Sequence, residues 1–136
     1  MNTISLKCGC GAVEIKVTGQ PLMRYVCHCD DCQTVHETAY ACALYPAALV
    51  KVSGETSAKV LKTSPRTRCA RCGTYLFAEM PGRDVRGING ALFPAGSFAP
   101  EFHIQCKFAK NPIMDELPHF RSLPTRFGGS GELMQW

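Results

Sequence analysis

The sequence lacks any long run of apolar residues. Its longest such run, YACALYPAALV, is too short to cross a bilayer, and Pro46 interrupts it. The first residues, MNTISLKCGCG, lack the apolar core of a signal peptide. We therefore expect neither a membrane span nor export, and we predict a cytoplasmic protein.

A sustained hydrophobic repeat of 3.6 residues is also missing, which argues against a helical bundle. Apolar residues alternate with polar ones instead: Val13, Ile15 and Val17 fall on one side of an expected strand. Turn signals such as TGQP and SGET separate similar short runs. The expected strands cover residues 12–17, 22–26, 39–45, 49–52, 58–62, 74–79 and 102–108. This pattern predicts a mainly β fold of short strands.

With 136 residues the chain has the length of one domain. We predict that this domain covers residues 1–124 and that the glycine-rich residues 125–136 form a C-terminal tail. One short helical segment is expected over residues 30–37, with Asp30 or Asp31 as its N-cap.

Cysteine is abundant, with nine in the chain, which is an odd number. Without an export signal, clustered cysteines are more typical of metal ligands than of disulfides. Cys8 and Cys10 are also too close in sequence for an easy disulfide. Seven of the nine fall into three groups: Cys8 and Cys10; Cys27, Cys29 and Cys32; and Cys69 and Cys72.

These seven thiols divide naturally into four and three. The two pairs can close a four-thiolate zinc site, and closed sites of this kind are structural. The triple, within CHCDDC, makes a self-contained three-thiolate site with one open position, as in catalytic zinc sites. His28 points away from its two cysteine neighbours on an extended strand, which disfavours it as a ligand. The alternative is a second structural zinc whose fourth ligand is His36, His103, His119, Cys42 or Cys106. Cys42 and Cys106 otherwise fit an apolar core.

The positive charge is small once the metal is counted. Seven thiolates and two Zn²⁺ ions would lower the formal charge of +4 by three, to about +1. A nucleic-acid partner is therefore not expected from net charge.

The order and spacing of these motifs carry a family resemblance. The segments C-x-C-G, C-H-C-x-x-C and C-x-x-C-G-T-Y-L, followed by P-x-x-H-I and D-E-L-P-x-F, extend over about residues 5–120. In this respect the chain resembles the family of glutathione-dependent formaldehyde-activating enzyme and centromere protein V. The resemblance implies a β-tent fold of short antiparallel strands around a structural zinc.

The resemblance also implies roles for the cysteines. It assigns the structural zinc to Cys8, Cys10, Cys69 and Cys72, and the catalytic zinc to Cys27, Cys29 and Cys32. Two Zn²⁺ ions per chain are therefore expected. The implied activity is carbon–sulfur lyase chemistry on S-hydroxymethylglutathione, the adduct of glutathione and formaldehyde.

In such a mechanism, zinc acts as a Lewis acid toward the substrate thiol or hemithioacetal oxygen. A general acid/base is then needed for the hydroxyl proton, and Asp30, Asp31 and His36 are the candidates near the triple in sequence. The expected partner is a small thiol such as glutathione or its adduct; the oligomeric state is left open. The rival hypothesis is a non-enzymatic zinc module that binds a protein or nucleic acid.

Overall fold

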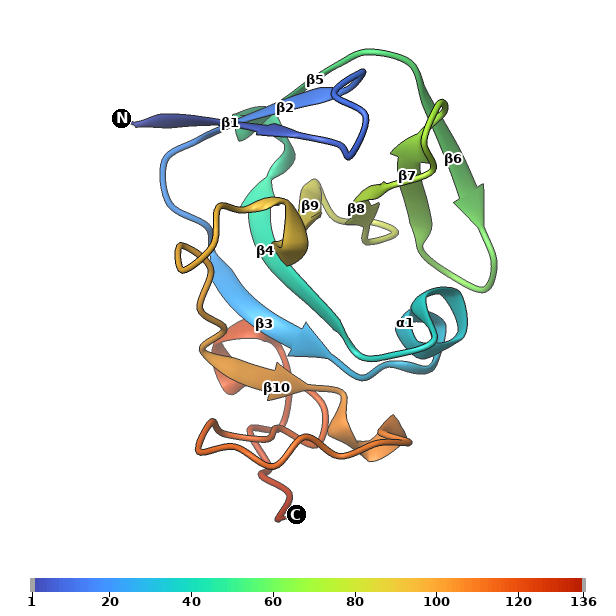
Figure 1. Ribbon diagram of the computed structural model, residues 1–136. Coiled ribbons are helices and arrows are strands. Elements are labelled where there is room, and N and C mark those ends of the chain that lie inside the picture. The colour runs from blue at the N-terminus through green and yellow to red at the C-terminus, as the bar shows by residue number, and fades with distance from the viewer. Residues whose placement is uncertain (1, 136) are drawn as a thin grey trace. The chain divides into compact units, whose positions relative to one another are not determined.

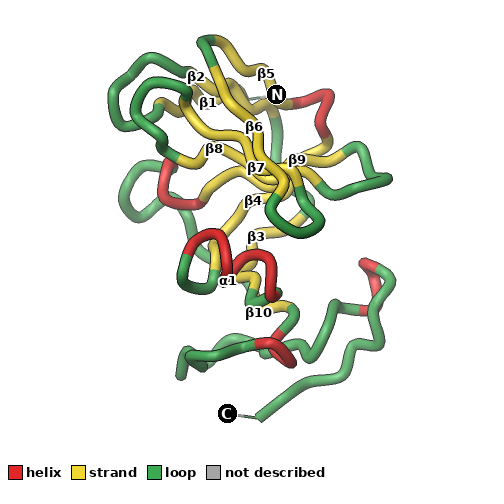
Figure 2. The backbone as a smooth tube through the Cα atoms, turned by 90° about the vertical axis from the view of Figure 1, so that its right-hand side faces the viewer, coloured by secondary structure: helices red, strands yellow, loops and turns green. Residues whose placement is uncertain are grey.

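The computed structural model describes residues 2–135, and its elements are mainly strands, as the alternating pattern predicted. The chain forms two compact units. The first unit holds the chain up to Met23 together with Ala43–Phe98, and the second holds Arg24–Cys42 and the chain from Ala99 onward. Figure 1 labels the strands and the α-helix, and Figure 2 shows how short the helical segments are. The division into one domain and a tail stays a prediction.

The first unit contains most of the strands. They are β1 (Thr3–Lys7), β2 (Glu14–Thr18), β5 (Val50–Ser53), β6 (Thr56–Val60), β7 (Pro65–Cys69), β8 (Tyr75–Glu79) and β9 (Val85–Asn89). Strand β4 (Tyr40–Pro46) begins in the second unit and ends in the first. One sheet has the order β1-β2-β5, and the other runs β4-β9-β8-β7-β6 within this unit. Two 3₁₀ segments, Ala47–Leu49 and Gly90–Leu92, follow β4 and β9.

The core of the first unit follows from the alternation along β2. Val13, Ile15 and Val17 are fully buried, whereas Lys16 between them is exposed. Leu6 of β1 pairs with Ile15 across the antiparallel hairpin and joins the same core. The core also contains Cys8 and Cys69, so the hydrophobic packing brings the two cysteine pairs to one place.

The second unit is smaller and holds β3 (Met23–Cys27, all but its first residue), helix α1 (Asp30–His36) and β10 (Phe102–Ile104). Two 3₁₀ segments, Cys106–Phe108 and Thr125–Phe127, complete it. The strand order here is β10-β3-β4, and β10 runs parallel to β3, with Ile104 opposite Cys27. Most of the sequence separates these two strands, and this provides the long connection that a parallel pair requires.

The structure corrects three details of the predicted elements. The strand expected over 102–108 ends at Ile104, because Gln105 adopts a left-handed backbone (φ 56°) and a 3₁₀ turn follows. Strands β1, β7 and β9 were not predicted. The N-cap of α1 is Cys29, not Asp30 or Asp31, because its sulfur accepts the N–H of Cys32. None of the helices described in residues 2–135 is long and apolar enough to span a membrane.

Candidate functional site

Two groups of cysteine sulfurs form in the structure, and they match the division into four and three. The Sγ atoms of the first group, which we call the four-sulfur cluster, all lie within 4.8 Å of one another. The same limit holds for the second group, the three-sulfur cluster. The four-sulfur cluster consists of Cys8, Cys10, Cys69 and Cys72, and the three-sulfur cluster of Cys27, Cys29 and Cys32.

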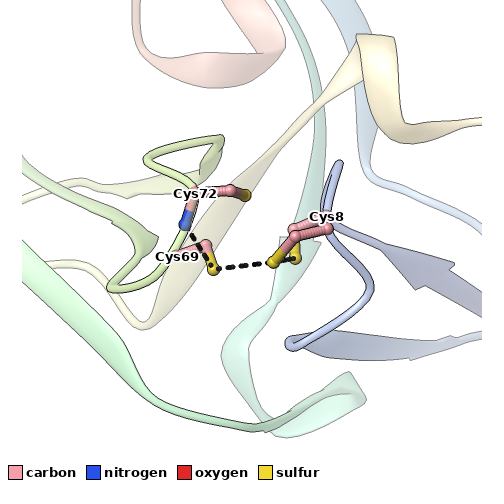
Figure 3. Close-up of side chains that lie close together, drawn as sticks. Cys8, Cys69 and Cys72 are labelled. Carbon is pink, nitrogen blue, oxygen red and sulfur yellow. Dashed lines mark hydrogen bonds between the residues drawn. The ribbon is translucent and has the colours of Figure 1, made fainter.

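The four-sulfur cluster is built by two similar turns of the first unit. Cys8 and Cys10 follow β1, and Cys69 and Cys72 flank the turn between β7 and β8. Each turn closes with a glycine at positive φ directly after its second cysteine, Gly11 (77°) and Gly73 (78°). Figure 3 shows Cys8, Cys69 and Cys72 gathered around one small space.

Backbone N–H groups point at these sulfurs. Val13 donates to the Sγ of Cys8 at 3.3 Å, and Cys72 donates to the Sγ of Cys69 at 3.4 Å (Figure 3). The Thr74 hydroxyl lies 3.0 Å from the Sγ of Cys72, and its hydrogen bond is the main cause that lowers the pKa of Cys72 to about 5. Such contacts stabilise thiolates, the form of cysteine that binds metal.

The sulfur spacing fits a tetrahedral metal. Sγ of Cys10 lies 3.6 Å from Sγ of Cys8 and 3.8 Å from Sγ of Cys69. Thiolates about 2.3 Å from a tetrahedral zinc are about 3.8 Å apart, whereas bonded disulfide sulfurs are about 2.05 Å apart. The donor set therefore fits zinc and does not fit disulfides.

The three-sulfur cluster lies where β3 passes into α1. Cys27 is the last residue of β3, Cys29 caps α1, and Cys32 is in the first turn of that helix. Cys27 and Cys32 are buried, and Cys29 is half-buried. The thiols of Cys29 and Cys32, together with burial, raise the pKa of Cys27 well above its ordinary value. A divalent cation offsets this crowding, because it stabilises deprotonated thiols.

Gln33 holds the backbone around this cluster, a role that the sequence did not reveal. Its side-chain amide donates to the carbonyl oxygens of His28 and Phe108, both at 2.7 Å. Its oxygen accepts the N–H of Lys110 at 2.9 Å. A buried glutamine satisfied by three backbone groups fixes the loop that carries the sulfurs.

Among the described residues, none of the five alternative fourth ligands has a ligand atom that joins the three-sulfur cluster within the 4.8 Å limit. Cys42 and Cys106 are buried, as expected for core cysteines. His36 stacks on Tyr40, with ring centroids 3.8 Å apart. His103 and His119 lie together with Asp115, in a third group of possible metal ligands.

Two of the candidate acid/base residues lie on α1 directly before Cys32. Asp31 is buried, and Asp30 is half-buried with its carbonyl accepting the Thr34 hydroxyl at 2.7 Å. His36 lies in the last turn of the same helix. Their catalytic role stays a prediction.

Comparisons with known proteins agree with the motif order. A family model described as "Glutathione-dependent formaldehyde-activating enzyme" matches residues 3–108. No curated protein matches the chain significantly. Among solved structures, a crystal structure of a Rhodobacter sphaeroides protein is similar, with a TM-score of 0.56 and 21% sequence identity. The match covers 68% of this chain and 89% of that protein, and at this identity it shows a shared fold.

Proposed function

Because the chain belongs to the glutathione-dependent formaldehyde-activating enzyme family, we propose that it is a zinc-dependent carbon–sulfur lyase-like enzyme. Its substrate would be a thiol–aldehyde adduct of the S-hydroxymethylglutathione type. The proposal includes a β-tent fold, one zinc domain over residues 1–124 with a tail over 125–136, and a cytoplasmic location. Two Zn²⁺ ions per chain complete it, one at each sulfur cluster.

The observation that carries this proposal is the composition of the three-sulfur cluster. Three thiols supply three ligands, and among the described residues no histidine or further cysteine joins them within the same 4.8 Å limit. A zinc ion held there would supply Lewis acidity and stabilise a thiolate or an oxyanion at its open position. Cys29 is half-buried whereas Cys27 and Cys32 are buried, so we expect a substrate sulfur to enter from the side of Cys29.

The reaction joins or separates a thiol and an aldehyde. In the forward direction the thiol loses its proton, its sulfur bonds to the carbonyl carbon, the carbonyl π bond breaks, and the oxygen takes up a proton. Asp30, Asp31 and His36 are the candidates for moving that proton, since α1 carries all three together with Cys32. Stacking against Tyr40 would hold the His36 ring in one orientation.

Exchange spectroscopy by NMR tests the proposal directly. Glutathione and ¹³C-formaldehyde are mixed to equilibrium, and the interconversion of free and adduct carbon is measured with and without protein. We expect the protein to accelerate the exchange and Cys32→Ser to remove the acceleration. Asp30→Asn, Asp31→Asn and His36→Gln identify the acid/base, with Glu37→Gln as the matched control at an exposed neighbouring position. A Cys32→Ser variant as fast as the parent contradicts the proposal, and a parent protein that does not accelerate the exchange supports the non-enzymatic rival.

A further inference from the structure

We propose that His103, Asp115 and His119 form a third metal site, separate from both sulfur clusters, for a divalent first-row transition ion. The candidate ligand atoms of these three residues lie within 4.8 Å of one another. Nε2 of His103 is 2.7 Å from Oδ2 of Asp115, and Nε2 of His119 is 3.4 Å from Oδ1 of the same carboxylate. Both rings therefore aim the same nitrogen at one carboxylate.

The backbone brings the two histidines together. His103 and His119 form a parallel β-bridge, in which His103 donates to the carbonyl of Pro118 and Phe120 donates to the carbonyl of His103, both at 2.9 Å. Residues paired in this way point to the same face, and the two rings stack with centroids 4.4 Å apart and an interplanar angle of 14°. Asp115 lies four residues before His119 and reaches both rings.

Further contacts hold the ligand atoms in place. Nδ1 of His103 is 2.9 Å from Nε2 of His28, which leaves Nε2 of His103 as the nitrogen directed at the site. The N–H of Leu117 donates to Oδ1 of Asp115 at 3.1 Å. Outer contacts of this kind orient histidine and carboxylate ligands in known metal sites.

The donor set suits a borderline metal. Two imidazoles and one carboxylate are typical ligands of Zn²⁺, Co²⁺ or Ni²⁺. The carbonyl oxygen of Ile113, 3.0 Å from Nε2 of His119, could serve as a fourth ligand. Ligands about 2.0–2.1 Å from a tetrahedral ion lie about 3.3 Å apart, so the His103–Asp115 pair has to separate by less than about 1 Å. The ion takes the place of the protons that the two Nε2 atoms share with these oxygens.

Burial also fits. Both histidines are buried, whereas about a third of the Asp115 side chain is exposed, 33%. An ion can therefore enter from the carboxylate side and bind nitrogens that are already desolvated. The site shares no ligand with the sulfur clusters, so its test does not depend on the proposed lyase activity.

The experiment is a titration with Co²⁺ of protein that carries two zinc ions per chain, one at each sulfur cluster, followed by absorption and NMR. We expect one equivalent to bind with weak visible bands and no near-ultraviolet thiolate charge-transfer band, because the ligands are nitrogen and oxygen. Paramagnetic broadening should affect the ring signals of His103 and His119. Asp115→Asn and His119→Gln should each weaken binding by at least about tenfold. Glu116→Gln, which removes the same charge at an exposed neighbour, should bind like the parent.

Three outcomes overturn the proposal. They are no Co²⁺ binding by the parent, binding accompanied by a thiolate band, and unchanged binding by the Asp115→Asn variant. If the variants do not fold, the ring signals of the parent decide: unbroadened His103 and His119 signals at saturating Co²⁺ mean that the cluster is a hydrogen-bonded network without a metal.

Discussion

At the scale of single residues, a residue outside the cysteines helps to hold the four-sulfur cluster together. This residue is Thr74. Its hydroxyl contacts the Sγ of Cys72 at 3.0 Å and accepts the N–H of Gly9 at 3.2 Å, so it links the two turns that carry the cluster. Thr74 therefore stabilises both a thiolate and the approach of the two turns.

We expect Thr74→Val to weaken zinc retention at this cluster by about 10–100-fold, because an outer hydrogen bond to a ligand is lost. Zinc release to a chromogenic chelator measures the effect. Thr74→Ser keeps the hydroxyl and should release zinc like the parent. Equal release rates for the valine and serine variants would mean that the hydroxyl does not support the thiolate.

Gly54 shows a second residue-scale constraint. Its φ is 107°, and a Cβ placed there would lie 2.4 Å from the carbonyl oxygen of Ala12 and 2.9 Å from the Cα of Val13. No L-residue fits without moving the backbone between β5 and β6.

Gly54→Ala should lower the free energy of unfolding by about 1–3 kcal/mol, as expected for strain combined with a backbone clash. Gly82→Ala is the matched control, because Gly82 also has a positive φ (77°) but nothing within 4 Å of its Cβ position. Denaturant unfolding compares the two. If Gly82→Ala lowers the free energy of unfolding as much as Gly54→Ala does, the backbone clash at Gly54 does not contribute.

At the scale of elements, hydrogen bonds of Gln33 help to hold α1 in position. The side chain joins the end of β3, through the carbonyl of His28, to the loop at Phe108 and Lys110. The contacts to Phe108 and Lys110 join segments that are 75 and 77 residues apart in the sequence. The loop that carries the three-sulfur cluster is thus held from outside the CHCDDC motif.

We predict that Gln33→Glu empties the three-sulfur cluster while the four-sulfur cluster keeps its zinc. The glutamate cannot donate to the two carbonyl oxygens, and leaving buried polar groups unsatisfied costs about 1–3 kcal/mol each. Native mass spectrometry should find about one zinc per chain instead of two. Gln20→Glu makes the same change at an exposed position and should retain both ions. Full zinc content in Gln33→Glu would show that the cysteines alone hold the loop.

At the scale of the whole molecule, the two sulfur clusters differ in how much chain they join. Cys10 and Cys69 are 59 residues apart, so the four-sulfur cluster links the hairpin β1–β2 to the turn between β7 and β8. The three-sulfur cluster draws all its ligands from residues 27–32. Metal binding at the first cluster therefore restricts far more of the chain, and it contributes directly to folding.

Cys69→Ser should thus unfold most of the protein, whereas Cys32→Ser should stay folded, keep one zinc and lose thiol binding. Thermal melts, zinc content and glutathione titrations of both variants test this. Equal unfolding by the two substitutions would make the second metal structural. A folded Cys32→Ser variant that still binds glutathione like the parent would contradict the open-site mechanism.

The sequence by itself determined the strand alternation of Val13, Ile15 and Val17, the mainly β class and the grouping of seven cysteines. These features are local: a period of two sets the buried face, and short cysteine spacings bring thiols together on one turn. The family followed from the same motifs.

Only the tertiary structure decided which distant groups meet. Thr74 against Gly9, Gln33 against Phe108, and His103 against His119 and Asp115 are contacts that no periodicity encodes. Strands β7 and β9 escaped prediction for the same reason, because sheet pairing and burial, rather than local alternation, stabilise them. The C-terminal end of β10 and the cap of α1 depended on individual backbone angles and hydrogen bonds, which propensity leaves undetermined.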